Sequence, residues 1–146
     1  DREAAGDWLR DGVEQVVRRA EALGTIAALE PEPGMLVETV DEWRGLDIPG
    51  LRLALDTGHC LVTGELAPDV AVREFAHELG TVSIEDMRRG VHVHLPFGEG
   101  DMPIPAVLGV LEAVGFEKLV CVELSRESHR ADTMIPQALA YLEARA

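Results

Sequence analysis

The sequence predicts an α/β fold, a parallel (β/α) half-barrel. Short apolar runs alternate with segments of helical periodicity, and this alternation is typical of parallel strands joined by helical crossovers. Each of the four apolar runs ends in ionisable or polar residues, at the edge where α/β folds place ligands. A full (β/α)₈ barrel takes about 250 residues, whereas this chain has 146. We therefore expect one domain, residues 1–146, equivalent to half of such a barrel.

The expected elements follow one another in the order α-β-α-β-α-β-α-β-α. Apolar residues at helical spacing indicate the helices, and short apolar runs bounded by turn residues indicate buried strands. The helices are expected at residues 2–23, 35–46, 67–79, 104–114 and from about 132 to 144, and the strands at residues 25–29, 51–55, 81–84 and 119–122.

Glycine and capping residues set the expected helix limits. Gly24, Gly80 and Gly115 each follow the last apolar position of a helix, where glycine commonly ends one. Asp132 or Thr133 is suited to cap the last helix. The polar segment 87–102 is expected to be a long loop.

Charge and cysteine content exclude several classes of protein. The chain has 27 acidic and 13 basic residues and a formal net charge of −14, which repels nucleic acids and anionic membranes. No apolar stretch approaches the roughly 20 residues of a membrane-spanning helix. Cys60 and Cys121 are too few and too far apart for a disulfide framework, so a reducing cytoplasm is the expected location.

Four ionisable side chains are candidates for one site at the carboxyl edge of the sheet. Glu30, Asp56 and Glu123 follow strands, and His94 lies in the polar loop. Carboxylates with an imidazole suit a divalent metal, Mn²⁺, Mg²⁺, Co²⁺ or Zn²⁺, and the two glutamates could also act as acid and base. The alternative for each residue is structural: strand-end carboxylates are often only solvated, and Asp56 could cap backbone amides.

The loop carries two further features. His92 and His94 alternate in an extended segment, so their imidazoles face the same side, which suits either metal binding or a solvated edge strand. Arg88 and Arg89 follow the third strand and could hold an anionic or polyhydroxylated substrate, or form surface ion pairs.

Four segments together resemble the xylose isomerase-like TIM barrels, a family of sugar and sugar phosphate isomerases and epimerases with related apurinic endonucleases. The segments occur in the family's order between Thr25 and His129: ALEPEPG, LALDTGHC, VSIEDMRRGVHVHLPFGEGDMPIP and VCVELSRESH. The resemblance implies that this chain corresponds to strands five to eight, the C-terminal half of a barrel whose N-terminal half is absent from it.

The resemblance also implies roles for individual residues. Glu30, Asp56 and Glu123 match ligands of the single divalent metal of the epimerases. In those enzymes the two glutamates exchange protons with carbon atoms beside a keto group. His59, three residues after the aspartate, matches a residue that holds substrate, and we assign Glu32 to the substrate as well.

The third strand departs from the family pattern. Ser83 stands where the family has a metal-binding histidine, so His94 or Glu85 is expected to replace that ligand. Arg89, six residues further on, matches a substrate-binding arginine. His92 and His94 resemble the D-x-H segment that helps the endonucleases hold additional zinc.

Three functions follow as hypotheses. The first is a metal-dependent isomerase or epimerase of a sugar, sugar phosphate or related polyol, acting by proton transfer beside a carbonyl. The second is a metal-free or non-catalytic barrel that binds a small molecule. The third, an apurinic endonuclease, is disfavoured by the net charge and by the single lysine, Lys118. In each case the open sheet edges call for an N-terminal half-barrel or a second chain.

Overall fold

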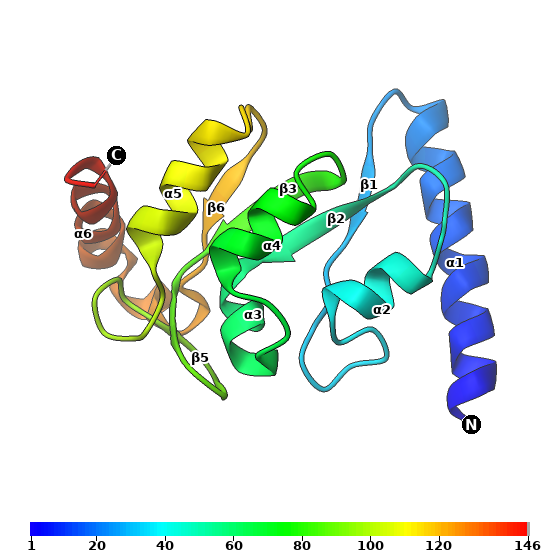
Figure 1. Cartoon of the computed structure of the whole chain (residues 1–146), viewed down its shortest axis with the longest axis horizontal. Coiled ribbons are helices and arrows are strands. Elements are labelled where there is room, and N and C mark those ends of the chain that lie inside the picture. Colours follow the sequence, from blue (N-terminus) through cyan, green and yellow to red (C-terminus); the bar gives the residue numbers. More distant parts are fainter. Residues whose placement is uncertain (146) are drawn as a thin grey trace.

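A computed structural model describes residues 1–145 of the chain. Its centre is a parallel sheet with the strand order β1-β2-β3-β6 (Figure 1). The strands are β1 (Ala27–Leu29), β2 (Leu51–Asp56), β3 (Leu79–Ile84) and β6 (Val120–Val122). Each neighbouring pair runs parallel, and the sheet formed by the described residues does not close. The predicted parallel (β/α) half-barrel is confirmed.

Helices connect the strands and flank the two ends of the sheet, with α1 beside β1 and β2 and α6 at the opposite end (Figure 1). They are α1 (Arg2–Ala22), α2 (Val40–Gly45), α3 (Thr57–Thr63), α4 (Pro68–Glu74), α5 (Ile104–Ala113), the 3₁₀ helix η1 (Ser125–Arg130) and α6 (Ala131–Glu143). The core between helices and sheet is apolar, and its fully buried side chains include Leu53, Phe75, Val82 and Val107.

Two predicted helix limits are wrong. The helix expected at 67–79 ends at Glu74, and Gly80, expected to stop it, lies inside β3. A Cβ at Gly80 would lie 2.8 Å from Cβ of Arg52 and 3.1 Å from Cβ of Ala28, so close packing within the sheet favours glycine there. The helix expected at 35–46 begins only at Val40, because the Thr39 side chain accepts from the Glu42 N–H and caps it there.

The start of the last helix also differs from the prediction. The 3₁₀ helix η1 leads directly into α6, so the helix begins at Ala131, and Arg130 holds the N-cap position without a side-chain cap. Neither Asp132 nor Thr133 caps this helix.

The segment expected to be a loop contains a β-hairpin. Strands β4 (Asp86–Arg88) and β5 (Val91–Leu95) pair antiparallel. The buried Asp86 carboxylate fixes the return of the chain by accepting from the N–H groups of Gly98 and Met102, at 2.8 and 2.9 Å. This hairpin places β5 against α3, beside the carboxyl ends of the parallel strands.

The edges of the sheet are open. Beyond β1 and β6 the described part of the chain supplies no further strand. Large apolar side chains are exposed along these ends of the molecule, among them Trp8 at 75%, Ile26, Ile135 and Leu139. Within residues 1–145, no helix has the length and apolar character needed to cross a membrane.

Candidate metal site

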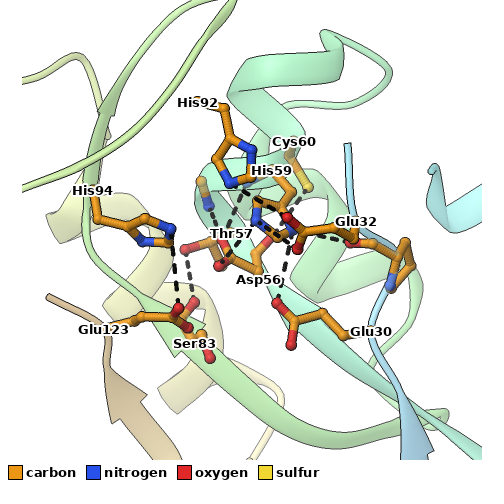
Figure 2. Close-up of polar contacts among 12 residues, drawn as sticks. Glu30, Glu32, Asp56, Thr57, His59, Cys60, Ser83, His92, His94 and Glu123 are labelled. Atoms are coloured by element: carbon orange, nitrogen blue, oxygen red, sulfur yellow. Dashed lines mark hydrogen bonds and ion pairs between the residues drawn. The ribbon is translucent and has the colours of Figure 1, made fainter. Parts of the chain in front are cut away.

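Three carboxylates from three strands meet at the carboxyl edge of the sheet (Figure 2). Glu30 follows β1, Asp56 is the last residue of β2, and Glu123 follows β6. Each offers one oxygen, and the three oxygens lie within 4.8 Å of one another. The convergence expected from the strand ends is therefore present, although β1 and β6 lie at opposite edges of the sheet.

Asp56 has one structural oxygen and one free oxygen. Its Oδ1 accepts from the N–H groups of Gly58 and His59, at 2.7 and 3.1 Å, and so caps the start of α3. Its Oδ2 is buried and accepts no hydrogen bond from residues 1–145. The capping role and the ligand role, weighed against each other in the sequence, are compatible because each uses a different oxygen.

His59 is oriented by the backbone of the loop after β1. Its Nδ1 lies 2.9 Å from the Pro31 carbonyl oxygen. A carbonyl only accepts, so Nδ1 carries a proton, and in the neutral ring the lone pair is on Nε2. That Nε2 lies 3.4 Å from Asp56 Oδ2 and 3.5 Å from Glu32 Oε2. A ring held in this way by its other nitrogen is typical of metal-binding histidines.

The β4–β5 hairpin adds two imidazoles to the same space. His92 and His94 are alternate residues of β5, and one nitrogen from each lies within 4.8 Å of a His59 nitrogen and of the other. His92 Nε2 is 3.7 Å from Glu32 Oε1, and His94 Nε2 is 3.9 Å from Glu123 Oε1. The histidines thus form a second group of potential ligands directly beside the carboxylates (Figure 2).

Glu85, one of the two residues expected to replace the missing histidine, also lies in this space. It is fully buried, and neither of its carboxyl oxygens finds a hydrogen-bond partner in the described chain. One of these oxygens lies within 4.8 Å of ligand atoms of Asp56 and His94. The sequence points to Glu85 because it lies two residues after Ser83, and Ser83 occupies the position at which the family carries its metal-binding histidine.

Burial, helped by neighbouring negative charge, raises the pKa of two of these acids. Burial, and then the charge of Asp56, raises the pKa of Glu30 to about 7, while His59 opposes the rise. Burial followed by the charge of Asp56 raises the pKa of Glu85 to about 10. A cation among these groups would relieve both the burial cost and the mutual repulsion.

Arg89 lies away from this cluster, whereas Ser83 lies beside it. Arg89 is exposed in the hairpin turn, where its backbone N–H donates to Asp101 Oδ2 at 3.0 Å. Ser83 pairs in register with Asp56 on the neighbouring strand. Cys60 is buried, Cys121 is half-buried, and both are free thiols.

The donor set fits a divalent metal. Buried ligand atoms without hydrogen-bond partners among residues 1–145 belong to Asp56, His59, Glu85 and His94. Buried polar atoms are normally paired, so several unpaired ones aimed at one space indicate a ligand. Carboxylate oxygens with imidazole nitrogens suit Mg²⁺, Mn²⁺, Co²⁺ or Zn²⁺.

Three solved structures illustrate the similarity of the fold. The probable 3-DHS dehydratase AsbF from Bacillus anthracis has a TM-score of 0.82 and 14% identity, with 100% of this chain and 59% of that chain covered. D-Psicose 3-epimerase with D-tagatose, from Clostridium cellulolyticum H10, has a TM-score of 0.72 and 19% identity, with 99% of this chain and 56% of that chain covered. The IolI protein with a bound zinc atom has a TM-score of 0.73 and 22% identity, with 96% of this chain and 55% of that chain covered.

The chain spans little more than half the length of these proteins, in agreement with a half-barrel. No curated protein matches the chain in a sequence search. The profile of one family, described as xylose isomerase-like TIM barrel, matches residues 1–145. This chain therefore belongs to the xylose isomerase-like TIM barrel family.

Proposed function

We propose that this chain carries the metal site of an isomerase or epimerase that acts on a sugar, a sugar phosphate or a related polyol. The observation that supports this most is the meeting of Glu30, Asp56 and Glu123 within 4.8 Å at the ends of separate strands. In this proposal His94 completes a ligand set with those three carboxylates. A divalent metal held there supplies a Lewis acid that polarises the oxygens of a bound substrate.

The two glutamates are the proposed acid and base. They follow the outermost strands of the sheet, so they approach the site from opposite sides. In the metal-free chain burial raises the pKa of Glu30 to about 7. A bound metal would lower this pKa and keep Glu30 a carboxylate that can accept a proton. Glu123 is half-exposed and lies 3.9 Å from His94. One glutamate removes a proton from carbon beside a carbonyl, and the other returns a proton.

Substrate contacts are proposed for His59, Glu32 and Arg89. His59 and Glu32 border the site directly, whereas Arg89 is exposed in the hairpin turn. A substrate that reaches beyond the metal toward the hairpin would contact all three.

We also propose that the chain is the C-terminal half of a barrel, equivalent to strands five to eight. Four more βα units, in the same polypeptide or in a second chain, would pair with β1 and β6. The similar solved proteins have nearly half of their length outside the matched region, and apolar side chains are exposed at both ends of the sheet here. The D-psicose 3-epimerase among these proteins supports the sugar substrate class.

Isotope exchange tests the chemistry. A panel of ketoses is incubated with the metal-loaded protein in D₂O, and nuclear magnetic resonance follows deuterium entering the carbon beside the carbonyl. Exchange should fall by about 100-fold or more in Glu30→Gln and Glu123→Gln, because general acid–base catalysis contributes on that scale. Glu112→Gln, an exposed change on α5, is the matched control. Equal exchange in all four proteins would contradict the proposed roles.

Two other functions have some support. Ser83 in place of a metal-binding histidine favours a binding protein without catalysis, and such a protein would bind a polyol yet exchange no deuterium. The group formed by His59, His92 and His94 favours an endonuclease-like site with additional zinc. The net charge of −14 opposes DNA binding, and cleavage of a duplex with an abasic site would be the direct test.

A further inference from the structure

Glu85 is a buried acid to which the proposed chemistry gives no role. It is one residue past the end of β3 and two residues past Ser83. Side chains alternate along an extended chain, so residues 83 and 85 face the same side. Ser83 itself pairs in register with Asp56. Glu85 therefore lies two residues further along the chain than the missing histidine, on the same side of the sheet as the metal ligands.

The lack of a side chain at Gly58 leaves room for the Glu85 carboxylate. A Cβ at Gly58 would overlap Glu85 Oε1 and would lie 2.8 Å from Met87 Sδ, so any larger residue at position 58 would displace the acid. Glu85 has an exposed fraction of 0%, and neither oxygen has a hydrogen-bond partner in the described residues. An acid buried without hydrogen-bond partners costs free energy. One Glu85 carboxyl oxygen lies within 4.8 Å of ligand atoms of Asp56 and His94.

We propose that Glu85 is a ligand of the divalent metal together with Asp56 and His94, and that it supplies the donor missing at Ser83, where the family carries a histidine. This inference rests on the proposed metal site. Exchanging an imidazole for a carboxylate makes the donor set harder. The affinity for Mn²⁺ should therefore rise relative to that for Zn²⁺, compared with a site that has histidine at position 83.

Binding of the metal alone tests the proposal. Mn²⁺ affinity is measured by electron paramagnetic resonance on the purified chain, and coordination is followed by the absorption spectrum of bound Co²⁺. Glu85→Gln should weaken Mn²⁺ binding by at least about 10-fold, since even the partners that only orient metal ligands contribute 10–100-fold. Adding Ser83→His to Glu85→Gln should restore binding and favour Zn²⁺ over Mn²⁺. Glu112→Gln should bind Mn²⁺ like the original chain.

The outcomes separate this inference from the proposed function. If Glu85→Gln and Ser83→His/Glu85→Gln both bind Mn²⁺ with unchanged affinity while Asp56→Asn does not bind it, Glu85 is no ligand and the metal site stands. If the original chain binds no divalent metal, both proposals fail. Circular dichroism shows whether Glu85→Gln folds; if it does not, Glu85→Asp keeps the charge and withdraws the carboxylate by one methylene. Unchanged Mn²⁺ affinity in Glu85→Asp would overturn the inference.

Discussion

Asp56 combines two roles that separate variants can resolve. Through Oδ1 it caps α3 with bonds of 2.7 and 3.1 Å to the N–H groups of Gly58 and His59. Through Oδ2 it faces the metal site. Asparagine keeps an oxygen for the cap and places an NH₂ group near His59 Nε2, which lies 3.4 Å from Oδ2 and accepts a hydrogen bond when the ring is neutral. Alanine removes both oxygens.

The predicted effects on stability therefore differ between the two variants. Without metal, Asp56→Ala should lower the free energy of unfolding by about 1–2 kcal/mol, the contribution of an N-cap side chain. Asp56→Asn should change it by less than about 1 kcal/mol, because the cap remains and charge repulsion with Glu30 is relieved. Both variants should lose divalent-metal affinity by at least about 10-fold.

Urea unfolding in EDTA, followed by circular dichroism, measures the first effect, and Mn²⁺ titration measures the second. The reasoning is refuted if Asp56→Asn is as unstable as Asp56→Ala, because the cap would then require the charge. It is equally refuted if either variant binds Mn²⁺ like the original chain, because Oδ2 would then be no ligand.

Three further predictions concern the surroundings of the site. Gly58→Ala should lower the free energy of unfolding by about 1–3 kcal/mol in urea, because its Cβ would overlap the Glu85 carboxylate. The control is Gly109→Ala, at a helix position with no surrounding heavy atom within 4 Å among the described residues, and it should not destabilise the chain. In EDTA, stability should fall as pH rises above 4.5, because folded Glu30 and Glu85, with their raised pKa values, hold protons that the unfolded chain has released. Glu30→Gln should reduce the slope between pH 4.5 and about 7 and leave the part due to Glu85, and an unchanged slope would contradict the assignment of Glu30. Asp86→Ala should cost about 2–4 kcal/mol, through its two bonds to backbone N–H groups, and should open the hairpin to limited proteolysis; undiminished protease resistance would argue against this bracing role.

The sequence was sufficient for the parallel sheet and for the meeting of the strand-end carboxylates. Both follow from local rules: buried apolar runs form strands, and parallel strands bring their carboxyl ends to one edge. For this reason Glu30, Asp56 and Glu123 could be grouped although they lie far apart in the chain. The sequence also marked His94, through its alternation with His92.

What the sequence missed depends on tertiary contacts. The hairpin of β4 and β5 was expected to be a loop, because its pairing depends on Asp86 holding the N–H groups of Gly98 and Met102, twelve and sixteen residues away. The short helix α3 is absent from the predicted elements, because Gly58 is a weak helix former and the cap by Asp56 was only one of two interpretations. Glu85 could be predicted as a replacement ligand, but its burial without hydrogen-bond partners among the described residues could not, because that burial depends on tertiary packing.

The central claim is that the strand-end carboxylates and His94 hold a divalent metal. Elemental analysis of the purified protein, after reconstitution and removal of unbound ions, tests it most directly when Glu123→Gln is measured alongside. The account predicts about one divalent ion per chain and a reduced content in the variant. An absence of metal after reconstitution, or equal content in both proteins, would contradict it; two or three zinc ions per chain would assign binding to the histidine group as well.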